Sequence, residues 1–251
     1  MKAVITAAGK GTRSGLDGKF RKEMLPIYDH RNGRLVLRPI IDRIIYDLES
    51  SGIREVAAVL SLDDLITKNY LQREFPYVTI IHQAKQNGFG DAVRSAAEFV
   101  GGERFLLFAG DGILLNLRTF LPGFAEGSGE NRLVLMEVAD PSKYGVAVVR
   151  RINGRILVED VEEKPSKPRS NLALAAMYIL GHKVMDCLLD MAGENIELTP
   201  AISESIRTGN ETEAVIVDQS MWISVGKAET YHEILKRSLD FALKRESERS
   251  S

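Results

Sequence analysis

The chain has few of the residues that form disulfides or metal clusters. Of its 251 residues, one is cysteine, Cys187, and four are histidines. A single cysteine excludes a disulfide within the chain, and the scattered histidines lack the spacing of zinc ligands. Val184, Leu188 and Leu189 surround Cys187 in a helical pattern. We therefore expect Cys187 to be a buried thiol.

An excess of charge and long apolar runs are also missing. Lysine and arginine number 33 and aspartate and glutamate 35, which gives a formal net charge of -2. A nucleic-acid surface would require a basic excess. No apolar run approaches the roughly 20 residues of a membrane span, and the N-terminal apolar stretch is too short for a signal sequence. We therefore expect a cytoplasmic protein that binds neither nucleic acid nor membranes.

Strand and helix patterns alternate in the first half of the chain. Apolar periodicity predicts strands at 1–7, 55–60, 78–82 and 104–109, and helices at 40–48, 65–75 and 91–100. This alternation indicates a Rossmann-like, mostly parallel α/β sheet flanked by helices. Later segments predict antiparallel additions at 133–138, 145–149, 155–161, 173–180 and 214–217, then a helix at 230–243 and a frayed end at 244–251. With 44% hydrophobic residues, 1–251 is predicted to form a single domain.

A glycine-rich loop follows the first predicted strand. Gly9 and Gly11 allow the backbone to approach a ligand closely, and its N–H groups can point at a phosphate. Arg13 and Lys22 supply the positive charge that a polyphosphate requires. Ligands of such sheets bind beyond the carboxyl ends of the strands, where three loops are expected to converge: 9–13, 83–90 and 110–112.

Several motifs in the same order resemble those of the sugar-phosphate nucleotidyltransferases, in particular the glucose-1-phosphate thymidylyltransferases and uridylyltransferases. The resemblance covers nearly the whole chain. It rests on Ala7–Arg13 with Lys22–Ile27, Gln83 with Gly88–Ala92, Gly110–Asp111, Tyr144–Val146, Glu162–Pro165, Ser170–Ala173 and Trp222–Gly226. It implies the nucleotide-diphospho-sugar transferase type of fold, with a nucleotide-binding half at about 1–130 and a sugar-phosphate-binding half at about 131–251.

The resemblance also implies a reaction and its partners. A sugar 1-phosphate attacks the α-phosphate of UTP or dTTP and releases pyrophosphate. Assembly of the chain into a homo-oligomer is a further possibility. Arg13 would hold the leaving group, Lys22 the α-phosphate, and Asp111 a magnesium ion. Nucleotide-binding residues would be Ala7, Ala8, Gly9, Gly11, Thr12, Gln83 and Gly88. Sugar-phosphate-binding residues would be Gly145, Glu163, Lys164 and Asn171.

The residues themselves leave less specific interpretations open. Lys22 is one of several cations in its loop, and Asp111 can cap a turn after Gly110. The pair Glu163 and Lys164 is also typical of a solvated surface. For Gln83, the carboxamide can offer a pyrimidine both a donor and an acceptor.

Departures from the family pattern concern the metal and the sugar. Ser224 replaces the aspartate that is the second metal ligand in the family, and a hydroxyl is a weaker magnesium ligand than a carboxylate. The loop between Arg13 and Lys22 is one residue short and lacks the family prolines. Ala176 stands where a glycine is common, and Gly112 where a polar residue is frequent.

These departures support two alternative functions. One is a catalytically weakened nucleotide-sugar-binding or regulatory homologue. The other is a cytidylyltransferase that acts on a small phosphorylated alcohol. A dinucleotide oxidoreductase fits poorly, because Gly9, Gly11 and Gly15 lack the dinucleotide-binding spacing.

Overall fold

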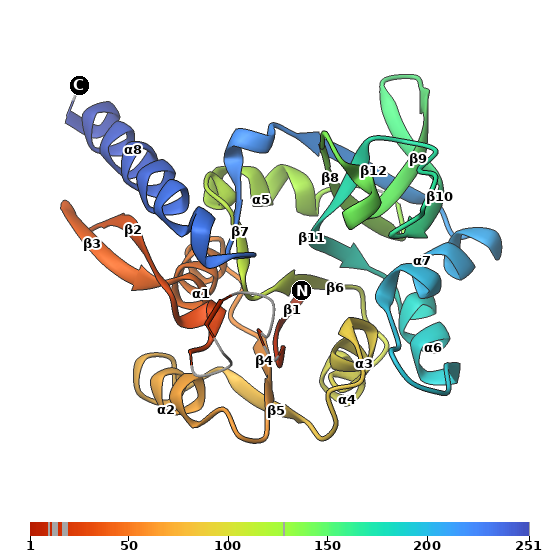
Figure 1. The fold of residues 1–251 in the computed structure, drawn as a ribbon, viewed down its shortest axis with the longest axis horizontal. Coiled ribbons are helices and arrows are strands. Elements are labelled where there is room, and N and C mark those ends of the chain that lie inside the picture. The colour runs from red at the N-terminus through yellow and green to blue at the C-terminus, as the bar shows by residue number, and fades with distance from the viewer. Residues whose placement is uncertain (10, 12–14, 17–19, 128, 251) are drawn as a thin grey trace.

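The computed structural model describes residues 1–9, 11, 15–16, 20–127 and 129–250, with backbone only for 245–250. Its centre is a nine-stranded sheet in the order β5-β4-β1-β6-β11-β8-β12-β10-β9 (Figure 1). The strands are β1 Lys2–Ala7, β4 Val56–Ser61, β5 Thr79–Gln83, β6 Phe105–Ala109, β8 Asn131–Glu137, β9 Gly145–Ile152, β10 Arg155–Glu163, β11 Leu172–Leu180 and β12 Thr212–Val217. Strands β5, β4, β1 and β6 are parallel, and β11 runs antiparallel to β6 and β8. The predicted fold class is thus confirmed.

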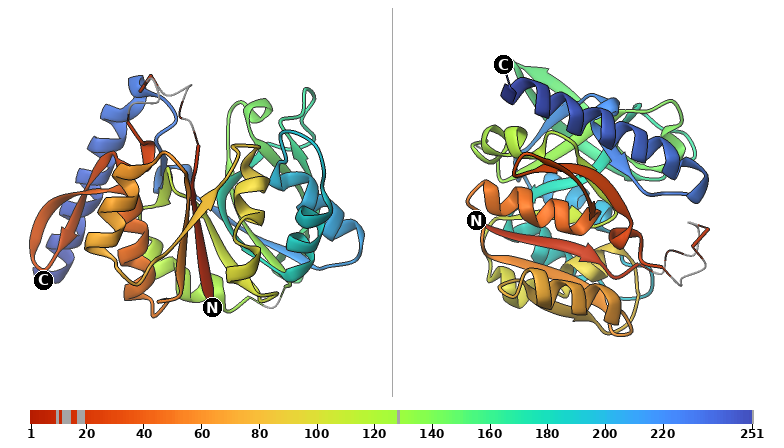
Figure 2. Two further views of the ribbon diagram at one scale, coloured as in Figure 1. Left: turned by 90° about the horizontal axis from the view of Figure 1, so that it is seen from below. Right: turned by 90° about the vertical axis from the view of Figure 1, so that its left-hand side faces the viewer.

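Helices cover both faces of this sheet (Figure 2). One apolar core includes α1, α2 and α5, and a second includes α3, α4, α6 and α7. The helices are α1 Ile40–Ser50, α2 Leu65–Glu74, α3 Phe89–Arg94, α4 Ala97–Val100, α5 Leu117–Ala125, α6 His182–Asp190, α7 Leu198–Arg207 and α8 Tyr231–Ser250. Every residue of β4 is buried, as expected for a parallel strand between two helical layers. No described helix combines the length and apolar character of a membrane span.

Three local predictions differ from the structure. The helix expected at 91–100 is two short helices, because the chain leaves helical geometry at Ala96 (φ -92°, ψ 8°). Helix α8 continues to Ser250, since Leu, Lys, Arg and Glu favour helix beyond its packed part. Cys187 is half-buried, because α6 buries Val184, Met185 and Leu188 and leaves Cys187 at the edge of that face.

Two small two-stranded sheets were not predicted. Strands β2 (Pro26–Arg31) and β3 (Arg34–Pro39) form a hairpin whose turn, Asn32–Gly33, has positive φ angles of 52° and 74°. An Asn-Gly pair is a strong hairpin signal, and Asn153–Gly154 forms the same kind of turn between β9 and β10, with φ angles of 49° and 79°. Strands β7 (Gly112–Leu114) and β13 (Trp222–Ser224) pair antiparallel and bring the segment 222–224 beside Asp111. Three-residue strands carry too little periodicity to predict.

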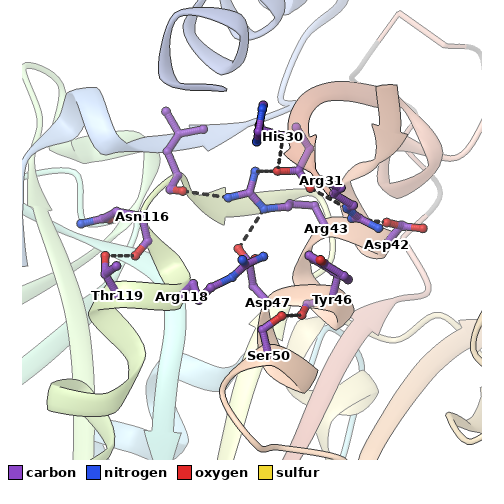
Figure 3. A network of polar contacts seen from close by, with 12 residues as sticks. His30, Arg31, Asp42, Arg43, Tyr46, Asp47, Ser50, Asn116, Arg118 and Thr119 are labelled. Atoms are coloured by element: carbon purple, nitrogen blue, oxygen red, sulfur yellow. Dashed lines mark hydrogen bonds and ion pairs between the residues drawn. The ribbon is translucent and has the colours of Figure 1, made fainter. Parts of the chain in front are cut away.

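A buried ionic network holds the β2–β3 hairpin and α1 against the segment that follows β7 (Figure 3). Arg43 is 1% exposed and pairs with Asp29 at 2.7 Å and Asp47 at 2.8 Å. It also donates a hydrogen bond to the carbonyl of Leu115 at 3.0 Å, and Arg118 reaches Asp47 at 2.9 Å. Because each buried charge has partners, the network fixes how these elements meet. It thereby supports β7, which begins directly after Asp111.

Candidate active site

A cavity of about 450 Å³ lies at the carboxyl ends of the parallel strands. Six of the seven predicted nucleotide-binding residues line it: Ala7, Ala8, Gly9, Gly11, Gln83 and Gly88. The seventh, Thr12, and the predicted catalytic Arg13 lie outside the described residues. Lys22, Asp111 and Lys164 also line this cavity, which we call the nucleotide cavity.

Close backbone contacts hold its walls together. The N–H of Gly110 donates to the carbonyl of Thr6 at 2.8 Å, and a Cβ at Gly110 would lie 3.1 Å from that oxygen. The absence of a side chain therefore lets the end of β6 approach β1. Gln86 Nε2 donates to the carbonyl of Ala8 at 2.6 Å and joins the loop after β5 to the glycine loop.

Lys22 and Asp111 form an ion pair in the nucleotide cavity. Lys22 begins a short 3-10 helix, Lys22–Met24, and its Nζ lies 3.5 Å from Asp111 Oδ2. The two side chains are 20% and 34% exposed, so both remain accessible to a ligand. Arg21 anchors the preceding residue, with ion pairs to Asp63 at 3.1 Å and Asp64 at 3.6 Å before α2. This anchor fixes where Lys22 enters the cavity.

Glu23 is an unusual buried acid beside this pair. It is 4% exposed, and its Oε1 has no hydrogen-bond partner. The pKa of the Glu23 carboxyl is raised from 4.5 to about 8, mainly by burial, with a smaller contribution from the negative charges of Asp64 and Asp111. The carboxyl is therefore largely protonated at neutral pH in the folded protein.

The pKa of Glu23 predicts a pH-dependent stability. The folded state binds this proton more tightly than the unfolded state, so stability is lost as pH rises from about 4.5 through about 8. We expect Glu23→Gln to match the wild type in urea denaturation at pH 4, below the unfolded-state pKa. At pH 9 it should be more stable, by up to about 1.4 kcal/mol per unit of pKa difference.

Glu55→Gln provides the matched control, because Glu55 is exposed. The difference in the free energy of unfolding between Glu55→Gln and the wild type should be the same at both pH values. Equal pH profiles for the wild type and Glu23→Gln would show that Glu23 ionises normally.

A second cavity, of about 620 Å³, adjoins the first at Asp111. We call it the acceptor cavity. Tyr144, Ala176 and Ser224 line it. Ala176 lies at an irregularity of β11 with φ of 48°, a left-handed conformation that favours glycine. The backbone thus gives a reason for glycine at this position that is independent of any sugar contact.

The predicted sugar-phosphate residues fall into two groups. Gly145 and Glu163 are paired between β9 and β10, and Lys164 follows Glu163 at the rim of the nucleotide cavity. The Glu163 carboxylate accepts a hydrogen bond from Thr199 Oγ1 at 2.7 Å and pairs with Lys164. Gly145, Glu163 and Asn171 line neither cavity; Asn171 is exposed, and its carbonyl accepts a hydrogen bond from Val138.

The described residues of the site offer too few ligands to hold a divalent metal without a bound substrate. Among the described residues, no group of three or more His, Cys, Asp or Glu side chains could hold an ion. Ser224 pairs with Gly112, and the N–H of Val225 donates to the Asp111 carbonyl at 2.9 Å, so position 224 is beside Asp111. Asp218 instead caps a turn through Ser220. One carboxylate with substrate phosphates is a donor set that suits magnesium.

Residues that motif reasoning missed also line the nucleotide cavity: Glu23, Gln86, Phe89 and Glu197. Hydrogen bonds between Asn87 and the segment 193–196 bring Glu197 to the cavity. The side chain of Asn87 donates to one carbonyl of this segment, and Asn87 accepts bonds from two of its N–H groups. Glu23 lies inside a recognised motif and Gln86 lies beside one. Their position next to assigned residues could therefore have identified them as part of the site. Glu197 is over 100 residues from Gln86, and no local pattern links them.

The chain belongs to the nucleotidyl transferase family, whose model matches residues 2–240. The family's substrates are a nucleoside triphosphate and a sugar 1-phosphate, and its members generally use a divalent metal.

Individual relatives match to different extents. The chain is 27% identical over 241 residues to the low-salt glycan biosynthesis nucleotidyltransferase Agl11 of Haloferax volcanii, covering 91% of this chain and 63% of that protein. It is also 27% identical over 283 residues to UTP–glucose-1-phosphate uridylyltransferase 2 of Staphylococcus saprophyticus, covering 98% of this chain and 93% of that protein. The fold resembles that of a UDP-glucose pyrophosphorylase complexed with UDP-glucose, with a TM-score of 0.77 and 21% identity. The match covers 97% of this chain and 98% of that chain. The chain thus spans just under two thirds of Agl11.

Proposed function

We propose that this protein transfers a uridylyl or thymidylyl group from UTP or dTTP to a sugar 1-phosphate and releases pyrophosphate. The observation that carries the proposal is the Lys22–Asp111 pair at the point where the two cavities meet. A triphosphate in the nucleotide cavity would place its α-phosphate there, within reach of an acceptor phosphate. Similarity to a uridylyltransferase over 93% of that enzyme supports UTP as a donor.

The residues present support an in-line displacement by positioning and charge. Lys22 would neutralise charge that builds up on the α-phosphate, while Lys164 would draw the acceptor phosphate to the cavity rim. Asp111 would hold Mg²⁺, which when bound supplies further positive charge to the phosphates. The ion pairs of Arg21 with Asp63 and the buried Asp64 would help to hold the backbone beside Lys22.

The test is turnover by the purified chain. UTP, dTTP and CTP are each combined with glucose 1-phosphate, other sugar 1-phosphates or a phosphorylated alcohol, in the presence of Mg²⁺, and pyrophosphate is measured. We expect release with UTP or dTTP and a sugar 1-phosphate. Release only with CTP and the alcohol would identify a cytidylyltransferase. Tight binding without release from any pair would overturn the proposed activity.

Ser224 supports a second candidate, a weakened nucleotide-sugar-binding homologue. Ser224→Asp would restore a carboxylate beside Asp111. We expect it to raise the affinity for Mg²⁺ in the presence of UTP by about 10-fold, because magnesium prefers carboxylate ligands. The measurement is a calorimetric Mg²⁺ titration of the protein with UTP bound.

Ser220→Asp adds the same charge at an exposed position that lines neither cavity. Its Mg²⁺ affinity should equal that of the wild type. An equal response of both variants would show that position 224 does not face the ion.

Turnover of the same variants decides between the two functions. If turnover also rises strongly in Ser224→Asp alone, the natural chain is the weakened homologue. Tighter Mg²⁺ binding without faster turnover favours the active enzyme.

A further inference from the structure

The amide of Gln83 has one orientation imposed by its neighbours. Gln83 ends β5, is 4% exposed and lines the nucleotide cavity. Its Nε2 lies 2.5 Å from Asp91 Oδ2 and 3.4 Å from the carbonyl oxygen of Gly88. Both neighbours can only accept hydrogen bonds, so the amide nitrogen must face them.

The donor group of Gln83 is therefore used inside the protein. No residue that the structure describes donates a hydrogen bond to its Oε1. Because Oε1 is not among the buried polar atoms that lack a partner, it is at least partly accessible. The expectation that Gln83 offers a base both a donor and an acceptor is thus too broad. What remains for a ligand is an acceptor.

Asp91 is itself held in a fixed orientation. Arg94 donates to Oδ1 through Nε at 2.9 Å, and its Nη2 lies 2.7 Å from the same oxygen. The Asp91 N–H donates to the carbonyl of Ile196 at 3.2 Å, and the residue is 8% exposed. With Oδ1 occupied by Arg94, Oδ2 is the oxygen available to Gln83.

We propose that Asp91 is a positioning residue that sets base recognition by holding Gln83 Oε1 toward the nucleotide cavity. The base must then present an N–H donor at Oε1, as uracil and thymine do at N3. This inference rests on the proposed function, which places a nucleoside triphosphate in that cavity. A base with acceptors alone would set a lone pair against Oε1 and leave that oxygen unsatisfied.

Asp91→Asn should reverse this arrangement. Because Arg94 still donates toward Oδ1, the new amide nitrogen would face Gln83 in place of Oδ2. Two N–H groups cannot bond to each other, so the Gln83 amide would flip and turn Nε2 toward the cavity, giving up its long 3.4 Å contact with the Gly88 carbonyl to keep the shorter bond to residue 91. The site would change from an acceptor to a donor without any change in volume.

Two triphosphates distinguish the two arrangements. UTP carries an N–H at N3, whereas the triphosphate of the pyrimidin-2-one riboside carries acceptors only on the same edge. We expect the wild-type protein to bind UTP at least about 10-fold more tightly, the equivalent of one lost hydrogen bond. In Asp91→Asn the ratio should fall to about one or invert. Dissociation constants are measured by calorimetry on variants that retain a cooperative thermal transition.

Two further variants separate recognition from folding. Arg94→Lys keeps both the carboxylate at position 91 and a cation beside it, so its preference for UTP should equal that of the wild type. Gln83→Met removes the amide, and it should bind the two triphosphates equally well even if Asp91→Asn fails to fold.

The outcomes separate this inference from the proposed function. If Asp91→Asn keeps the wild-type ratio, or loses both affinities in the same proportion, Asp91 does not set recognition and the inference is overturned. If the ratios change as expected but no pyrophosphate is released, the inference holds and the proposed activity fails. A wild-type protein that binds neither triphosphate contradicts both.

Discussion

Replacing Lys22 with glutamine is expected to lower the kcat for pyrophosphate release by about 10²–10³. Lys22 Nζ lies 3.5 Å from Asp111 Oδ2, where the two cavities meet. Its charge therefore acts on the phosphate that gains negative charge in the transition state. Because part of this attraction also exists in the bound state, the KM for UTP should change less than kcat. Steady-state rates over a range of UTP concentrations provide the measurement.

Lys2→Gln is the matched control for this substitution. Lys2 lies at the opposite end of the sheet from the cavity, at the start of β1, and pairs with Glu103 at 2.8 Å. It undergoes the same chemical change without touching the nucleotide cavity. Its kcat should stay within about two-fold of the wild type, because Lys2 lies outside the nucleotide cavity and its partners, Glu103 and the Val100 carbonyl, do not line that cavity either. A similar loss in both variants would show that Lys22 has no special part in the reaction.

Replacing Asp111 with asparagine should have an even larger effect, with a loss of at least about 10³ in kcat/KM. Among the described residues, Asp111 is the carboxylate at the junction of the two cavities, and Ser224 supplies no second charge beside it. An amide keeps the shape but lowers the affinity for a divalent cation. The expected signature is that UTP with Mg²⁺ stabilises the wild-type protein in thermal denaturation much more than it stabilises Asp111→Asn.

Asp218→Asn tests whether any nearby carboxylate would serve. Asp218 precedes β13 and accepts a hydrogen bond from the Ser220 N–H at 2.7 Å, and it lines neither cavity. Its loss should leave Mg²⁺-dependent stabilisation and turnover within about two-fold of the wild type. If Asp218→Asn abolishes both while Asp111→Asn retains them, the metal site is assigned to the wrong residue.

The Rossmann-like part of the fold was predictable because its signals are local. Long apolar runs such as β4 and the isoleucine stripe of α1 are set by burial, and burial leaves a period in the sequence. The division of 91–100 into two helices was not predictable, since Ala96 and its neighbours are ordinary helix formers. At the break the hydroxyl of Ser95 donates a hydrogen bond to the carbonyl of Asp91, a side-chain bond that competes with regular helix geometry.

The candidate site divides in the same way. Gly9, Gly11, Gln83, Gly88 and Asp111 stand in loops directly after strands, and parallel strands bring such loops to one edge of the sheet. Their convergence therefore follows from topology. The roles proposed for Arg13 and Thr12 remain predictions, as those residues lie outside the described part of the chain.

The sequence by itself determined the strand-and-helix alternation, the glycine loop and the charged residues expected at its mouth, because each depends on neighbours a few positions away. Only the tertiary structure decided the protonation of Glu23, the direction of the Gln83 amide and the place of Ser224 beside Asp111. These properties depend on burial and on hydrogen-bond partners from other elements. A linear pattern records the kind of group that a residue carries, whereas its charge state and direction are set by the atoms that fold around it.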